Sequence, residues 1–144
     1  MISEMISLDT EEKHTYLRCL AYIMQLRQSP ESKQSRKRIF LENQLREIGL
    51  PLQELDNIKV TNKADDIIND LKKIINIQTK RYILREMILL AIADHELNDK
   101  EISVIYQIGA KSGIKEEKVS DFFLWAAQGV EWQINGIKLI EEDI

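Results

Sequence analysis

The sequence predicts an all-α fold: a compact bundle of about seven or eight helices in a single domain, residues 1–144. Apolar residues recur at three- and four-residue spacing along almost the whole chain, as in Leu17, Leu20, Ala21 and Met24. Helix start and stop residues divide that pattern into segments. The length of 144 residues, 44% hydrophobic and 31% charged, suits one globular domain, and no Gly/Ser-rich or Pro-rich linker divides it.

Two helices are expected in the first third of the chain. Asp9 and Glu12 have the spacing of a capping box, in which each side chain accepts a hydrogen bond from the other residue's backbone. Ser29 followed by Pro30 suits the start of a second helix, and Gly49 suits its end. The segment LPLQEL then predicts a short helix or turn.

The middle of the chain predicts three further helices. Thr61 or Asn62 can cap the helix that carries ADDIINDLKKII. The next helix is expected from about Thr79 to the segment ADHELNDKE. Asn98 and Glu101 then have capping-box spacing at the start of another helix.

Glycines divide the last third. Gly113 suits a helix C-terminus, KEEKVSDFFLWAAQ predicts a helix ending at Gly129, and a final helix is expected from Glu131. Trp125 and Trp132 lie at helical spacing with Phe122, which is typical of core residues, although a tryptophan near a helix end also serves as an interface anchor.

The two halves of the chain resemble each other over a short stretch. FLENQLREIGLPLQEL and VIYQIGAKSGIKEEKV align with Leu41 on Ile105 and Gly49 on Gly113. Two readings stay open: a true internal repeat with pseudo-twofold character, or the chance likeness of any helix that ends in glycine before a second amphipathic helix.

Charge and cysteine content exclude several classes of protein. The formal charge of −4 opposes non-specific attraction to phosphate backbones, so nucleic acid is not an expected partner. No apolar run reaches the roughly 18 residues of a membrane span, and the first residues lack the pattern of an export signal. Cys19 is the single cysteine, so no intrachain disulfide can form, and a reducing cytoplasm is the expected location.

No catalytic arrangement is visible, and we expect no enzymatic activity. Cys19 and His14 lie five residues apart with no third group, so Cys19 is expected to be a small core side chain. The five glycines form neither a phosphate-binding loop nor a dinucleotide fingerprint.

The acidic segment ADHELNDKE is the candidate ion site. Asp94, Glu96 and Asn98 alternate like the first ligands of an EF-hand loop, but the glycine and the final glutamate of such a loop are missing. A looser Ca²⁺ or Mg²⁺ site would use four carboxylates: Asp94, Glu96, Asp99 and Glu101. The alternative is that these residues only cap the following helix, where acidic side chains meet the positive end of its dipole.

A basic stretch offers a second candidate surface. KQSRKR contains Arg36, Lys37 and Arg38, which form either a solvated helix face or a docking site for an acidic protein partner. Trp132 is the candidate aromatic anchor for such a partner.

The stretch LREMILLAIADHELNDKEISVIYQIGAKSGIKEEKV resembles the TerB-like domain family, named after bacterial tellurite-resistance proteins. The family pattern is an apolar helix, Ala-Asp-Gly, an acidic and a hydrophobic residue, a later Glu, and a helix ending in a Leu-Gly-Ile-like turn. Its positions correspond here to Ala93, Asp94, Glu96, Leu97, Glu101, Gly113 and Ile114. His95 departs from the pattern, because the family usually has Gly there, and the first half of the chain has no acidic counterpart.

The resemblance implies a helical bundle without catalytic machinery, whose acidic patch engages metal ions or partner proteins. We therefore expect a non-catalytic binding or scaffold module of a bacterial stress-response or defence system, with a possible divalent-cation site. The alternative is a purely structural interaction domain, whose acidic segment only caps helices and whose partner meets the basic face or the tryptophan end.

Overall fold

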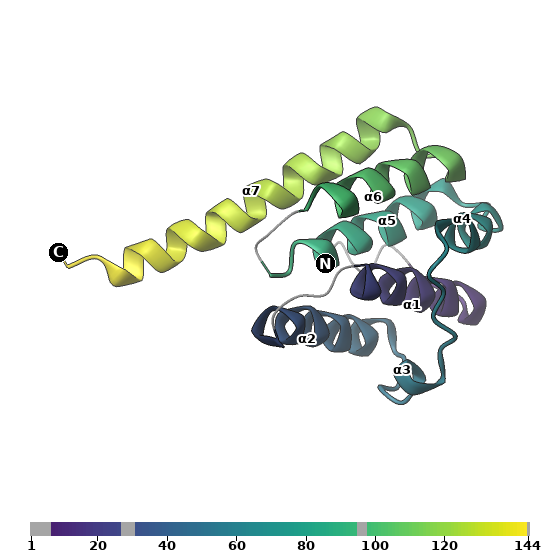
Figure 1. Cartoon of the computed structure of the whole chain (residues 1–144), viewed down its shortest axis with the longest axis horizontal. Helices are drawn as coiled ribbons and strands as arrows, with labels where there is room; N and C mark the ends of the chain where they lie inside the picture. Colours follow the sequence, from purple (N-terminus) through teal and green to yellow (C-terminus); the bar gives the residue numbers. More distant parts are fainter. Residues whose placement is uncertain (1–6, 27–30, 95–97, 144) are drawn as a thin grey trace.

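The computed structural model describes residues 7–26, 31–94 and 98–143, and these contain seven α-helices (Figure 1). No strand occurs within those ranges, so the all-α prediction is confirmed. The helices are α1 (Thr10–Gln25), α2 (Glu31–Ile48), α3 (Glu54–Asn57), α4 (Ala64–Lys72), α5 (Ile77–Ala91), α6 (Asp99–Ser112) and α7 (Glu116–Glu141).

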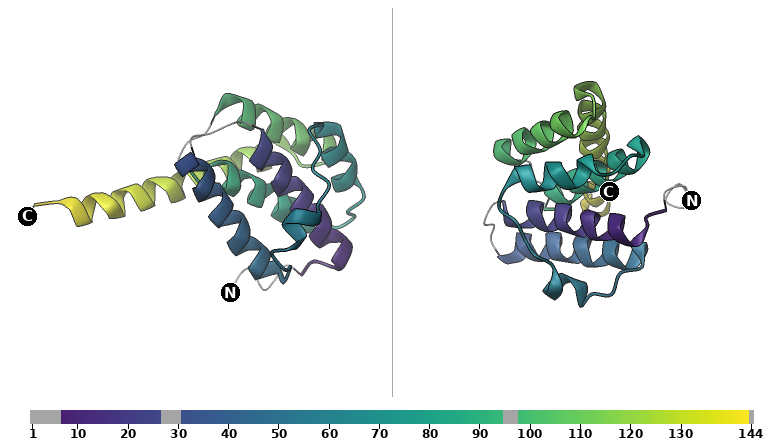
Figure 2. Two further views of the ribbon diagram at one scale, coloured as in Figure 1. Left: turned by 60° about the horizontal axis from the view of Figure 1, so that its bottom comes forward. Right: turned by 90° about the vertical axis from the view of Figure 1, so that its right-hand side faces the viewer.

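Six helices form a packed body, and the seventh crosses it and extends beyond it. Helix α1 packs against α2, α4 and α5, while α6 packs against α4 and α5. Helix α7 lies across α5 and α6, and Figure 2 shows its C-terminal part projecting from the body. Fully buried side chains from α1, α2, α4, α5 and α6 form one core, which includes Tyr16, Leu45, Leu71, Met87 and Ile105. Cys19 is buried in this core, as its apolar surroundings predict.

Several helix ends follow the predicted local chemistry. The backbone N–H of Glu12 donates to Asp9 over 2.8 Å and that of Asp9 donates to Glu12 over 3.0 Å, which is the expected capping box of α1. Gly49 and Gly113 follow α2 and α6 with φ of +81° and +97°, a left-handed conformation that glycine adopts without the steric cost of a Cβ.

The two similar stretches share this helix ending and then diverge. The N–H of Leu50 donates to the carbonyl of Leu45 over 2.9 Å, and the N–H of Ile114 donates to that of Gly109 over 2.8 Å. The element that follows is four residues long in the first case, α3, and 26 residues long in the second, α7. The likeness therefore describes one type of helix ending.

Two predicted helix starts need correction, and a third lies outside the described residues. Lys63, rather than Thr61 or Asn62, is the N-cap of α4. Thr61 still shapes this start, because its Oγ1 accepts a hydrogen bond from the N–H of Lys63 and donates one to Asp66. Helix α5 begins at Ile77 because Asn76 caps it, slightly before the expected start. The predicted Ser29–Pro30 start falls outside the described part of the chain.

The largest departure from prediction is α7, which is one continuous helix where two were expected. Gly129 and Gly136 lie inside it without a left-handed conformation, so neither ends the helix. Its 26 residues correspond to a length of about 39 Å. Trp125 and Trp132, expected in the core, are 48% and 74% exposed, since the helix carries them along and beyond the edge of the body.

Candidate interaction surface

The first half of α7 is held on the body by an apolar stripe. Val119 and Ala126 are buried, and Phe122, Phe123 and Val130 are partly buried against the core. These positions follow one another at three- and four-residue spacing, which places them on one face of the helix.

The same face continues on the second half of α7, where nothing in the described structure covers it. Ile137 follows Val119, and Ile140 follows Phe122, by 18 residues in each case, which is five helical turns. All residues of the α7 extension, defined as residues 131–141, are exposed. Of its large apolar side chains, Ile134, Ile137 and Ile140 lie on this face, whereas Trp132 and Leu139 lie on the opposite side of the helix.

A groove lies beside the point where α7 leaves the body. It encloses about 640 Å³ and is bounded by α2, the end of α5, and the middle of α7. Its lining is mainly apolar: Ile39, Phe40, Leu89, Ile92, Ala93, Trp125, Ala126, Gly129 and Val130, with Asn43, Gln128 and Gln133 as the neutral polar residues. Arg36 is the single charged residue among the described residues that line it. We call this the α2–α5–α7 groove.

An arginine on α5 contacts the aromatic rings of a tyrosine on α5 and a tryptophan on α7. The guanidinium carbon of Arg85 on α5 lies 5.2 Å from the ring centroid of Tyr82 and 5.5 Å from that of Trp125 on α7. Cations over aromatic faces are attracted by the ring quadrupole. Trp125 therefore contacts Arg85 of α5, and it also lines the groove and is 48% exposed.

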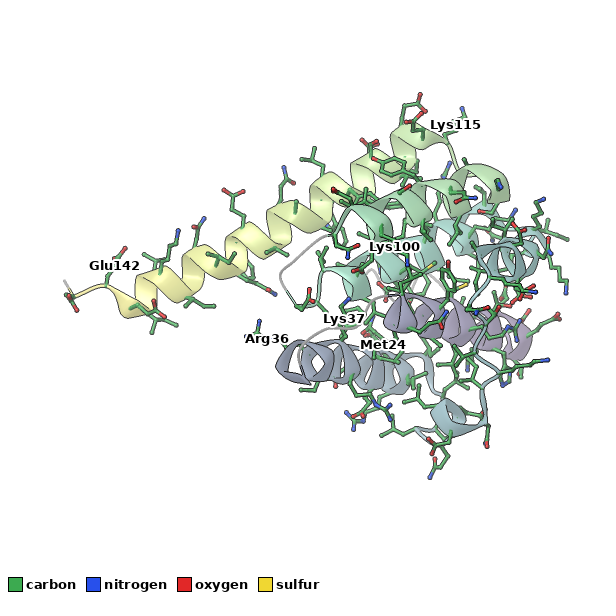
Figure 3. All side chains as sticks on the ribbon, viewed as in Figure 1. Met24, Arg36, Lys37, Lys100, Lys115 and Glu142 are labelled. Carbon is green, nitrogen blue, oxygen red and sulfur yellow. The ribbon has the colours of Figure 1, made fainter. Side chains whose placement is uncertain are left out.

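The basic and acidic segments singled out in the sequence meet inside the protein. Nζ of Lys37 on α2 lies 3.4 Å from Oε2 of Glu101 on α6, and the two side chains are 1% and 0% exposed. Figure 3 shows Lys37 on the inner side of α2. The prediction that Lys37 binds a partner is therefore corrected: its ammonium group compensates a buried carboxylate and does not belong to a solvated face.

The described residues of the acidic segment do not share one open site. Asp94 and Glu101 are buried, Asp99 is exposed, and Glu96 lies outside the described residues. Within the described ranges no group of three or more histidine, cysteine or acidic side chains is placed to hold a metal ion. The Lys37 ammonium beside Glu101 would also repel a metal cation at that carboxylate. Asn98 does cap α6, accepting from the N–H of Glu101 over 2.9 Å.

A further buried polar cluster ties α1, α2 and α5 together. Glu86 accepts hydrogen bonds from Tyr16, Gln44 and Arg85, and Tyr16 stacks on Tyr82. Burial raises the pKa of Glu86 above 4.5, although Arg85 and the hydrogen bonds oppose that rise. Burial also raises the pKa of Tyr16, and it raises that of Tyr82 to about 12. This cluster is a hydrogen-bonded network within the core, in which Arg85 Nε has no hydrogen-bond partner among the described residues.

The remaining predicted partner residues lie on the surface. Arg36 and Arg38 are exposed, and Arg38 pairs with Glu42 over 3.0 Å, one helical turn away. Arg36 lines the groove, and Trp132 is exposed in the α7 extension without lining it. The sequence analysis does not find Ile137 and Ile140 because it ends the helix at Gly129. The signal was present, since the apolar spacing continues through Gly129 without a change of phase.

No family model, curated protein or solved structure matches this chain. None of the described helices combines the length and the apolar character needed to cross a membrane.

Proposed function

We propose that this chain is a non-catalytic interaction module that holds an amphipathic helix in the α2–α5–α7 groove and along the α7 extension. The single observation behind the proposal is the exposed apolar face of residues 131–141, which continues the stripe that packs α7 onto the body. Large contiguous apolar patches on a soluble protein mark interaction surfaces. An apolar groove beside a helix is the usual receptor for a second amphipathic helix.

The chemistry of the surface supports a helical protein partner. Trp125 lines the groove and Trp132 lies seven residues further along α7, and tryptophan is enriched among the residues that dominate binding energy. Arg36 adds one positive charge at the rim. The partner we expect has an apolar face with acidic residues at one end.

The resemblance to TerB-like domains gives this module a context, a bacterial stress-response or defence system in the cytoplasm. The basis for this context is the similarity of the stretch from Leu84 to Val119. It predicts that the neighbouring genes encode components of such a system. Neighbours with unrelated housekeeping roles would remove the context and leave the interaction module standing.

Affinity capture with matched variants tests the proposal. Trp132→Glu combined with Ile140→Glu places two charges on the α7 extension. The control Ile75→Glu places one charge on an apolar residue that is 98% exposed, in the turn between α4 and α5. We expect the wild type and the Ile75 variant to retain the same bound chain, and the double variant to lose it. Cross-linking mass spectrometry should place that chain against α2 and α7. Equal capture by all three proteins would refute the proposal.

A further inference from the structure

We propose that Glu86 is the positioning residue of the α2–α5–α7 groove: its ionised carboxylate holds the two walls of the groove at the spacing that accepts a partner helix, and its protonation loosens them. This inference rests on the proposed function and adds the regulation of that surface by pH. It assigns the role to a side chain that is buried in the core and does not itself line the groove.

Both walls of the groove rest on the helix that carries Glu86. The walls are formed by α2 and α7, and each of these helices packs against α5. Phe40 and Asn43 line the groove from α2, and Trp125 lines it from α7. The side chains of α5 that reach toward α2 and α7 therefore set the spacing of the walls.

The Glu86 carboxylate reaches both walls through one neighbour on each side. On the α2 side, Oε1 of Glu86 accepts a hydrogen bond from the amide of Gln44, which directly follows Asn43. On the α7 side, Oε2 accepts a hydrogen bond from Arg85 over 3.5 Å. The guanidinium carbon of Arg85 in turn lies 5.5 Å from the ring centroid of Trp125. One buried carboxylate thus connects the two walls.

The hydrogen bonds of this network match the ionised form of Glu86. Its carboxylate oxygens face three donors: the hydroxyl of Tyr16 over 3.4 Å, the amide of Gln44 and the guanidinium of Arg85. A deprotonated carboxylate only accepts, so it can receive all three. In the described part of the chain Arg85 is hydrogen-bonded to Glu86 alone, and its Nε has no partner. Protonation of Glu86 removes the ion pair and leaves Arg85 with its two aromatic neighbours.

Opposing interactions allow Glu86 to change its charge. Burial raises its pKa, whereas Arg85 and the hydrogen bonds lower it. The other titratable groups that face it are Tyr16 on α1, Glu47 on α2 and Tyr82 on α5. Glu47 adds to the rise, and burial raises the pKa values of both tyrosines, so they stay neutral. The α7 member of the network is a tryptophan, which does not titrate. A buried acid with a perturbed pKa is typical of a functional site.

Spin-label distances across the groove test the inference without any partner. Ile39 on α2 and Gln133 on α7 are exposed and line the groove, while the native Cys19 is fully buried and stays unlabelled. Labels at Ile39→Cys and Gln133→Cys should give a narrow distance distribution when Glu86 is ionised and a broader one as pH falls. With Glu86→Gln added, the broad distribution should appear at every pH. Circular dichroism verifies the fold at each pH.

The result that would overturn the inference is equally clear. A distribution that stays the same at every pH, or a change with pH that persists in the Glu86→Gln chain, would show that Glu86 does not set the wall spacing.

Tryptophan fluorescence gives a second readout in the free protein. The chain has two tryptophans, so Trp132→Phe leaves Trp125 as the single emitter. Its emission should follow a one-proton transition with a midpoint above 4.5. Glu86→Gln should abolish that transition, whereas the control Glu42→Gln, which removes a carboxylate paired with Arg38 on α2, should keep it. Emission of Trp125 that ignores this transition would contradict the link between Glu86 and the α7 wall.

Binding experiments separate the failure of this inference from that of the proposed function. The chain identified by capture and cross-linking should bind Glu86→Gln about tenfold more weakly than wild type when Glu86 is ionised, the effect of one hydrogen bond to a charged group. Glu42→Gln should bind like wild type. A chain lost with Trp132→Glu and Ile140→Glu but bound equally by Glu86→Gln refutes the positioning role and keeps the interaction module. If no chain is captured the proposed function fails, and the spin-label distances still decide whether Glu86 sets the wall spacing.

Discussion

The buried pair of Lys37 and Glu101 gives the sharpest stability prediction. At a separation of 3.4 Å, and with the effective dielectric of about 20 that suits protein sites, the two charges attract by about 5 kcal/mol. Replacing Lys37 with Met leaves the Glu101 carboxylate buried without its ammonium, and breaking a buried pair in this way costs about 3–5 kcal/mol. For a chain of this size the melting temperature should fall by about 10–15 °C.

Urea unfolding followed by circular dichroism measures this effect. Lys37→Met with Glu101→Leu should recover most of the lost stability, because a buried ion pair can be replaced by apolar side chains at little net cost. Arg38→Met is the matched control: it breaks the exposed pair with Glu42 on the same helix and should cost about 0.5 kcal/mol or less. Two results would refute the reasoning. One is a Lys37→Met protein whose free energy of unfolding lies within 1 kcal/mol of the wild type. The other is a double variant whose loss of stability equals the sum of the losses of the two single variants.

Three further predictions concern packing, pH and cations. Gly109→Ala should destabilise the protein by about 1–3 kcal/mol, since its Cβ would meet Val119 Cγ2 at 2.9 Å. Gly136→Ala should stabilise the protein by up to about 1 kcal/mol, because no atom lies within 4 Å of the new Cβ and alanine favours a helix over glycine. Thermal melts in which both variants shift stability in the same direction would contradict this. Because the pKa of Glu86 is raised in the folded state, its contribution to stability is present below 4.5 and is lost as pH rises through the folded pKa. Glu86→Gln should therefore gain stability relative to wild type in urea titrations as pH rises above 4.5, and a difference that is constant with pH would argue against the raised pKa. A divalent cation bound to the acidic segment should stabilise the wild type by about 2.7 kcal/mol when its concentration is a hundred times its dissociation constant. Identical melting temperatures in Ca²⁺, Mg²⁺ and chelator, for the wild type and for Asp94→Ala, would refute this cation site.

The helical fold could be predicted because its signals are local. The capping box at Asp9 and Glu12, the glycine at Gly113 and the apolar spacing of α4 and α5 act within one or two turns, so the sequence displays them directly. The N-cap of α4 could not be predicted, because Lys63 occupies it without a side-chain cap hydrogen bond, while the hydroxyl of Thr61 accepts the N–H of Lys63 just before the helix.

The candidate site depended on long-range contacts that spacing does not encode. Lys37 and Glu101 lie 64 residues apart, and nothing local distinguishes this buried lysine from its exposed neighbours Arg36 and Arg38. Gly129 was predicted to end a helix because glycine often does so, yet it does so only with a left-handed conformation, which Gly129 lacks. The continuous α7, and with it the exposed apolar face, follows from that one difference.

Amide hydrogen exchange at residues 131–141 tests the central claim most directly, that the apolar face of the α7 extension is covered by a second helix. These amides should gain protection when the captured chain binds, while core amides of α1 and α5 stay protected with or without it. Rapid exchange of the extension in the presence of the captured chain, equal to that of the Trp132→Glu and Ile140→Glu double variant, would contradict the account.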